Sequence, residues 1–121
     1  MTIISKQHIK IATRIAGYGD VIKGRMSALA LTKSGKIITC ASNHRLYGDY
    51  INWSEHCEAA VLRKLNKLKA FKRHCNITIF VFRISSFGIS LAKPCKKCQK
   101  LLSKYDVKVL YTTDKGGIES L

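Results

Sequence analysis

The chain has 121 residues, which is enough for one domain with a hydrophobic core but not for two. Hydrophobic residues make up 46% of the sequence, yet no apolar run approaches the length of a membrane span. The N-terminal residues also lack the apolar region of a signal peptide. We therefore expect a single intracellular, cytoplasmic domain over residues 1–121 that does not interact with a membrane.

The charge of the chain is strongly unbalanced. Lysine and arginine total 22 against seven acidic residues, which gives a formal net charge of +15. A merely soluble surface does not need such an excess, whereas a polyanionic partner does, because neutralised phosphates release counterions and so supply affinity. We therefore expect a nucleic-acid partner, single-stranded DNA or RNA. Phosphorylated nucleotides and compositional drift remain as alternatives.

Hydrophobic periodicity divides the chain into helical and strand-like segments. The predicted elements, in chain order, are a helix at about 8–22, strands at 26–32 and 37–42, a helix at about 54–71, a strand at 77–85, a helix at about 94–105 and a strand at 107–112. The first helix places Ile11, Ile15 and Tyr18 on one side, as expected of a helix that covers a core. The turn at 33–36 predicts that the first two strands form a hairpin.

This order of elements predicts an α/β fold, a three-layer α/β/α sandwich with a mixed sheet of at least four strands. Strands that are joined through helices should be parallel, and apolar residues on both strand faces suit burial between helix layers. We expect Gly116 and Gly117 to end the regular structure.

Three residues have the chemistry of a zinc site: His56, Cys95 and Cys98. One imidazole and two thiolates supply three ligands and leave the fourth tetrahedral position to water, which is typical of a catalytic zinc. A C-x-x-C motif alone also fits a redox pair or half of a structural zinc site. In combination with the histidine, it predicts one Zn²⁺ per chain.

Glu58 lies two residues after the expected ligand His56. A carboxylate beside such a site, and not itself a ligand, can move protons between a water molecule and a substrate nitrogen. We therefore predict that Glu58 is the catalytic residue.

Both motifs are expected at helix N-termini that point towards the metal. Ser54 is a suitable N-cap for the helix that carries the first motif in its first turn. Pro94 fits the first position of the next helix, which places Cys95 and Cys98 one turn apart. The positive end of a helix dipole favours the thiolate form that zinc requires.

The motifs H-C-E at 56–58 and P-C-K-K-C at 94–98 resemble the signature of the cytidine deaminase-like superfamily. This superfamily includes free cytidine and deoxycytidylate deaminases, tRNA adenosine deaminases and polynucleotide cytosine deaminases. The resemblance covers residues 25–113 and implies the same zinc ligands and a proton-shuttling Glu58. It also implies substrate binding by Asn43, at a position where many members place an asparagine.

The chain departs from that superfamily in several ways. Cys57 stands where alanine is usual, and we interpret it, with Cys40 and Cys75, as a buried or incidental thiol in a reducing compartment. The segment 99–111 is similar to the branch with parallel last core strands, which holds the deoxycytidylate, tRNA and polynucleotide enzymes. The fifth strand and extra helix of many relatives are expected to be missing. Pairing in a homo-oligomer is one way to cover the resulting sheet edge.

The loop between the second strand and the zinc helix carries basic and aromatic residues. Arg45 and Tyr47 are candidate substrate-binding residues, because bases stack on aromatic rings and guanidinium planes. Trp53 also fits base stacking, but we favour its packing of the loop against the domain. Lys96 and Lys97 lie between the zinc cysteines, so we expect them near the mouth of the site.

Several functions fit these residues. The favoured hypothesis is zinc-dependent hydrolytic deamination of cytosine to uracil in single-stranded nucleic acid, because one phosphate does not require a charge of +15. The alternatives are a free nucleotide deaminase of the dCMP/CMP type, a tRNA adenosine deaminase and a non-catalytic, zinc-stabilised nucleic-acid-binding module. The glutamate in the first motif argues against the last of these.

Overall fold

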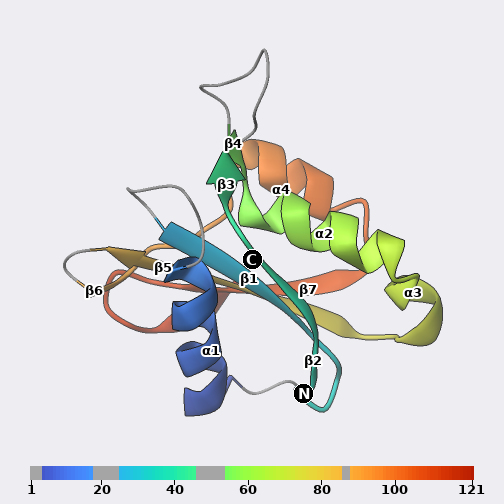
Figure 1. Cartoon of the computed structure of the whole chain (residues 1–121), viewed down its shortest axis with the longest axis horizontal. Coiled ribbons are helices and arrows are strands. Elements are labelled where there is room, and N and C mark those ends of the chain that lie inside the picture. Colours follow the sequence, from blue (N-terminus) through green and yellow to red (C-terminus); the bar gives the residue numbers. More distant parts are fainter. Residues whose placement is uncertain (1–3, 18–24, 46–53, 86–87) are drawn as a thin grey trace.

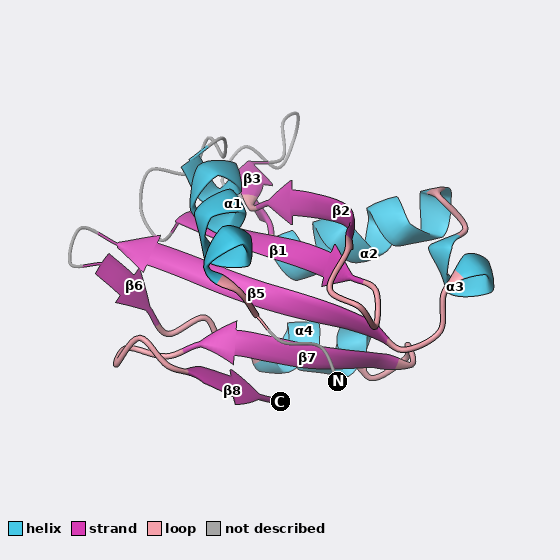
Figure 2. Ribbon diagram, turned by 90° about the horizontal axis from the view of Figure 1, so that it is seen from below, coloured by secondary structure: helices cyan, strands magenta, loops and turns pink. Residues whose placement is uncertain are grey.

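The fold is a six-stranded mixed sheet between two layers of helices. The computed structural model describes residues 4–17, 25–45, 54–85 and 88–121. Helix α1 lies on one face of the sheet, and helices α2 and α4 lie on the other (Figure 1, Figure 2). The elements are α1 (Lys6–Gly17), β1 (Arg25–Leu31), β2 (Ile37–Ser42), β3 (His44–Arg45), β4 (Ser54–Glu55), α2 (Cys57–Lys67), α3 (Ala70–Arg73), β5 (Ile77–Ser85), β6 (Gly88–Ser90), α4 (Lys96–Leu102), β7 (Val107–Thr112) and β8 (Ile118–Ser120). The predicted α/β/α architecture is confirmed.

The strand order in the sheet is β2-β1-β5-β7-β8, with β6 paired to β5. Strands β1 and β2 form the predicted antiparallel hairpin, closed by a 2.8 Å hydrogen bond from the Thr32 amide to the Lys36 carbonyl. Strands β5 and β7 are parallel, as expected of strands joined through a helix, and Ile79 lies opposite Val109. A separate two-stranded sheet pairs β3 with β4.

The predictions for the end of the sheet are wrong. Regular structure does not end at Gly116 and Gly117, because β8 follows and pairs antiparallel with β7, with Thr112 opposite Ile118. A fifth core strand is therefore present, and the last two strands are antiparallel rather than parallel. Residues 113–117 alone connect them. So short a connection can close a hairpin, but a parallel crossover needs a dozen residues or more.

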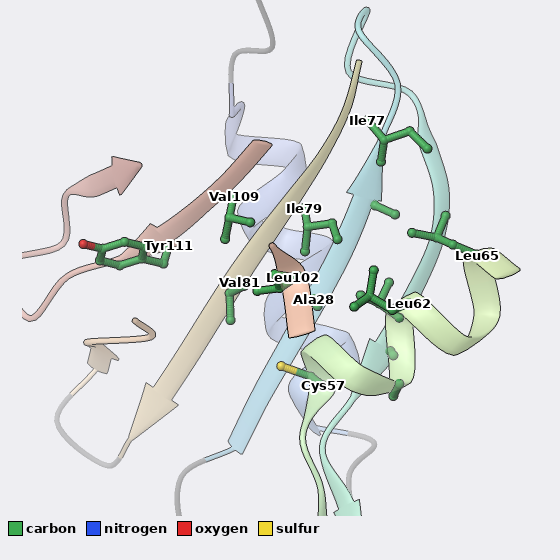
Figure 3. Close-up of a cluster of buried hydrophobic side chains, with 14 of the residues drawn as sticks. Ala28, Cys57, Leu62, Leu65, Ile77, Ile79, Val81, Leu102, Val109 and Tyr111 are labelled. Carbon is green, nitrogen blue, oxygen red and sulfur yellow. The ribbon is translucent and has the colours of Figure 1, made fainter. Parts of the chain in front are cut away.

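Two hydrophobic clusters fill the two faces of the sheet. On the side of α2 and α4, buried residues of the helices and the strands meet, with Cys57 at one end of the cluster (Figure 3). These residues include Leu62, Leu65, Ile79, Val81, Leu102 and Val109. On the side of α1, Phe80, Phe82 and Leu29 pack against two alanines of the helix. The sheet is thus buried on both faces, as its strand sequences predict.

Helix α1 covers the sheet as predicted, and Ile11 packs partly buried against the core, but the helix ends at residue 17 and its most buried residues are different ones. Ala12 and Ala16 are fully buried, so small side chains rather than isoleucines allow the close approach to the sheet. Buried His8 donates from Nε2 to the Gly35 carbonyl at 2.7 Å and so ties the helix to the β1–β2 turn. Tyr18 lies outside the described residues.

The helices on the other face begin later than predicted. Ser54 is not a helix cap but a residue of β4, and His56 is the N-cap of α2. Cys95 is the N-cap of α4, so Pro94 precedes that helix instead of opening it. The predicted helix at 54–71 is divided into α2 and α3 at Lys69, which has a φ of 55°. Within the part of the chain described, no helix combines the length and apolar character needed to cross a membrane.

Candidate active site

His56, Cys95 and Cys98 come together where α2 and α4 begin. One ligand atom of each residue lies within 4.8 Å of the other two. The Nδ1 atom of His56 is 3.3 Å from Cys98 Sγ and 3.8 Å from Cys95 Sγ. Tetrahedral zinc bonds of about 2.0–2.3 Å place neighbouring ligand atoms roughly 3.5–3.8 Å apart. The donor set and its spacing therefore fit a zinc ion with three protein ligands.

Two of these residues are also the starting points of helices. The His56 carbonyl accepts the Ala60 amide of α2 at 3.0 Å, and the Cys95 carbonyl accepts the Gln99 amide of α4 at 2.8 Å. Neither helix has a side-chain cap hydrogen bond at its N-terminus. The positive ends of both helix dipoles thus lie at the candidate metal group, where they favour anionic thiolates. This arrangement agrees with the expectation that both helix N-termini point towards the site.

The segment that leads into the second motif is fixed by hydrogen bonds to β7 and to α4. The Ala92 amide donates to the Thr112 carbonyl and the Thr112 hydroxyl donates to the Ser90 carbonyl, each at 2.8 Å. The Gln99 side-chain amide donates to the Pro94 carbonyl, also at 2.8 Å. Thr112 and Gln99 therefore position the cysteines. The sequence gives no signal for Thr112, because its partner is 22 residues away.

Glu58 is 1% exposed and lies beside the candidate ligands. The Cys57 thiol donates a hydrogen bond to Glu58 Oε1, with an Sγ–O distance of 2.9 Å. Burial, and then the negative charge of Glu58, raise the pKa of the Cys57 thiol. Cys57 is therefore buried, as expected, but it is not incidental, because a protonated thiol holds the predicted catalytic carboxylate.

The same two causes act on Cys98. Burial first, and then the charge of Glu58, raise the pKa of the Cys98 thiol well above its usual range. A cation bound between the thiols and the imidazole reverses that effect, since a coordinating thiol is deprotonated. The buried cysteine and the nearby carboxylate thus form an anionic site that suits a divalent metal.

The structure places three of the predicted substrate-binding residues. Asn43 follows β2 and is buried, and its Oδ1 accepts the Met26 amide at 3.0 Å. Its side-chain oxygen therefore already accepts a hydrogen bond from the start of β1. Lys96 and Lys97 occupy the first two positions of α4 and are exposed. Substrate binding by these residues stays a prediction.

The remaining candidates lie in or near the segment between β3 and β4. Arg45 belongs to β3 and is paired with Ser54 of β4. Tyr47 and Trp53 lie outside the described residues. Tyr111 of β7 is buried, and its hydroxyl donates to Glu119 Oε2 at 3.1 Å. This side-chain hydrogen bond therefore links β7 to β8, where Tyr111 and Glu119 lie opposite each other.

No protein-family model matches the sequence, and neither does any curated protein. The structure, however, is similar to solved structures of cytidine deaminases. That from Burkholderia pseudomallei has a TM-score of 0.69 and 14% identity, over 98% of this chain and 92% of that chain. That from Mycobacterium leprae has a TM-score of 0.63 and 14% identity, over 97% and 94%. A mutant cytidine deaminase from Mycobacterium tuberculosis has a TM-score of 0.52 and 16% identity, over 81% and 77%. The chain therefore has the cytidine deaminase-like fold that its motifs predicted.

Proposed function

We propose that the protein is a zinc-dependent hydrolase that deaminates cytosine to uracil. The observation that carries this proposal is the group formed by His56, Cys95 and Cys98, whose ligand atoms lie within 4.8 Å of one another, next to a buried glutamate. Three protein ligands leave the fourth position for water, as a catalytic zinc requires. The cytidine deaminase-like fold supports the same activity.

The chemistry divides between the metal and the chain. Bound zinc supplies a hydroxide at neutral pH, because it lowers the pKa of its water. Glu58 takes up a proton from that water and transfers it to the ring nitrogen of the base, and then helps to protonate the amino group that leaves as ammonia. Cytosine and water thus give uracil and ammonia. The hydrogen bond from Cys57 keeps one carboxylate oxygen of Glu58 in a fixed orientation for these transfers.

We favour cytosine in single-stranded nucleic acid as the substrate. The support for this choice is the net charge of +15 and the two lysines, Lys96 and Lys97, between the zinc cysteines. The likeness to the branch with parallel last strands no longer supports a polynucleotide substrate, because β7 and β8 are antiparallel. Electrostatics therefore carries this part of the proposal.

A free nucleoside or nucleotide is the second candidate substrate. It is favoured by the similar structures, which are cytidine deaminases and match this chain over almost its whole length. On this alternative, a basic residue near the site binds at most one phosphate. The positive surface then has a role other than substrate capture.

One experiment tests the activity and separates the substrates. The purified protein, with its zinc content measured, is incubated with cytidine, dCMP, single-stranded DNA, duplex DNA and tRNA, and uracil, inosine and ammonia are assayed. Glu58→Gln is the matched control, because the amide still accepts the Cys57 hydrogen bond but cannot shuttle protons. We expect one zinc per chain in both proteins and turnover only in the wild type. Absence of zinc, or four protein ligands to it, contradicts the proposal, as does inosine as the only product.

A further inference from the structure

The positive charge of the protein is concentrated on one layer of the fold. Residues 56–73 and 94–105, which contain α2, α3 and α4, hold ten of the 22 lysines and arginines but one of the seven acids. These 30 residues therefore carry nine of the 15 net positive charges, whereas the other 91 residues carry six. Compositional drift would not produce such a difference between parts of one small domain.

The charges of this layer are on its surface. All ten basic side chains are exposed: Arg63, Lys64, Lys67, Lys69, Lys72, Arg73, Lys96, Lys97, Lys100 and Lys104. The one acid, Glu58, is buried at the candidate active site and does not offset them. Several of the basic residues are also four positions apart, a spacing at which like charges destabilise a helix. An external polyanion relieves that repulsion.

The helices of the layer form one continuous surface that begins at the candidate active site. Both α2 and α4 start at a candidate zinc ligand, and the two helices run side by side (Figure 1). Beyond the far ends of these helices, Phe71 of α3 stacks on Tyr105, which follows α4, with ring centroids 5.0 Å apart. The side chain of Asn66 also donates to the Tyr105 hydroxyl at 2.9 Å. The exposed basic residues are therefore carried by helices that contact one another from the candidate site to the Phe71–Tyr105 pair.

We propose that this basic layer, defined by the ten residues above, binds the phosphate backbone of a single-stranded nucleic acid whose base enters the candidate active site. Deamination of that base rests on the proposed function, whereas binding of the phosphate backbone by the layer is independent of it. Ten exposed basic side chains can neutralise several phosphates of a polynucleotide. A free nucleotide in the candidate active site can contact only the basic residues nearest to that site. A single strand fits because its bases reach an active site without being flipped out of a duplex.

The test compares two variants of equal net charge. The layer variant reverses Lys67, Lys72, Arg73 and Lys104 to glutamate, and all four lie at least six residues from the candidate ligands in the sequence. The control variant reverses Lys6, Lys10, Lys36 and Lys115, which are equally exposed but lie outside the layer. Fluorescence anisotropy then measures the binding of labelled single-stranded DNA and RNA at several salt concentrations. A Glu58→Gln background prevents turnover during the titration.

We expect the layer variant to bind at least about tenfold more weakly, and the control variant within about threefold of the unreversed protein. The log–log salt slope of the layer variant should fall by about two to three units, since each phosphate on a single strand contributes about 0.7. Equal losses in the two variants would show that net charge, not the layer, determines binding. Glutamine at the same four positions repeats the test if glutamate impairs folding.

Activity of the same variants with Glu58 restored separates this proposal from the proposed function. Loss of oligonucleotide deamination with unchanged cytidine deamination in the layer variant supports both. Unchanged deamination of both substrates overturns the role of the layer and leaves the deaminase intact. Layer-dependent binding without deamination of any base supports the layer and contradicts the enzyme.

Discussion

The thiol of Cys57 offers a direct way to test how the predicted catalytic carboxylate is held. Its Sγ atom lies 2.9 Å from Glu58 Oε1 and the side chain is fully buried. Cys57→Ala removes the donor, whereas Cys57→Ser keeps one at nearly the same place. If Cys57 only packs the core, serine should be the worse replacement, because it buries a hydroxyl. If Cys57 orients Glu58, alanine should be the worse one.

The size of the effect follows from this contact. A hydrogen bond to a charged group contributes about 1.5–3 kcal/mol, but a thiol is a weak donor, so about 1–1.5 kcal/mol is expected here. If the transition state loses this whole contribution, kcat decreases by about five- to twelvefold. The alanine variant should also lose about 1 kcal/mol of stability, since it removes one buried group of roughly methylene size.

Steady-state kinetics with the preferred cytosine substrate measures the effect. We expect kcat to fall in Cys57→Ala with little change in KM, because Cys57 contacts the carboxylate of Glu58, and Cys57→Ser should restore most of the activity. The infrared S–H stretch that disappears in the alanine variant should lie at a lower frequency than that of a free thiol. Full activity in Cys57→Ala together with impaired Cys57→Ser would refute the reasoning.

Three further changes test other parts of the structure. Cys98→Ala should lose bound zinc, and its unfolding temperature should equal that of chelator-treated wild type, because metal binding contributes to folding; retained zinc would contradict this. Asn43→Ala should destabilise the protein by about 1–3 kcal/mol, since the Met26 amide loses its acceptor, whereas Asn43→Asp retains the acceptor. If the Asn43 amide also donates to the substrate, both variants lower kcat/KM; an unchanged kcat/KM in the aspartate variant excludes that role. Burial, with the hydrogen bond to Glu119, raises the pKa of Tyr111 above its ordinary 10.0. The unfolded chain therefore ionises first, so the stability supplied by the neutral hydroxyl falls as the pH rises above 10, and Tyr111→Phe should reduce this decline in unfolding experiments.

The parts of the fold that were predictable are those whose signals are local and strong. Strands β5 and β7 have the predicted bounds, because each is a run of β-branched and aromatic residues between polar turns. The metal group was also predictable, since each motif is short and lies at a helix N-terminus. Its assembly needed only that the fold bring two helix ends together.

The predictions that failed depend on distant contacts. The three residues of strand β8 are all exposed and show no hydrophobic alternation, so only its pairing with β7 defines it. Ser54 has the propensity of a helix cap, but pairing with Arg45 draws it into a strand and leaves His56 to start the helix. Thr112, which positions the segment before Cys95, acts across the sheet and carries no motif.

The sheet itself has a consequence for how copies of the protein behave together. Strands β2 and β8 are the outermost strands of the described sheet, and outer strands present backbone groups that can pair with another chain. A net charge of +15 repels two copies before such edges meet. Colloidal stability is therefore greatest in dilute salt. Colloidal stability decreases when salt or a bound polyanion screens the charge. Edge-to-edge association is therefore expected first in concentrated protein solutions that contain nucleic acid.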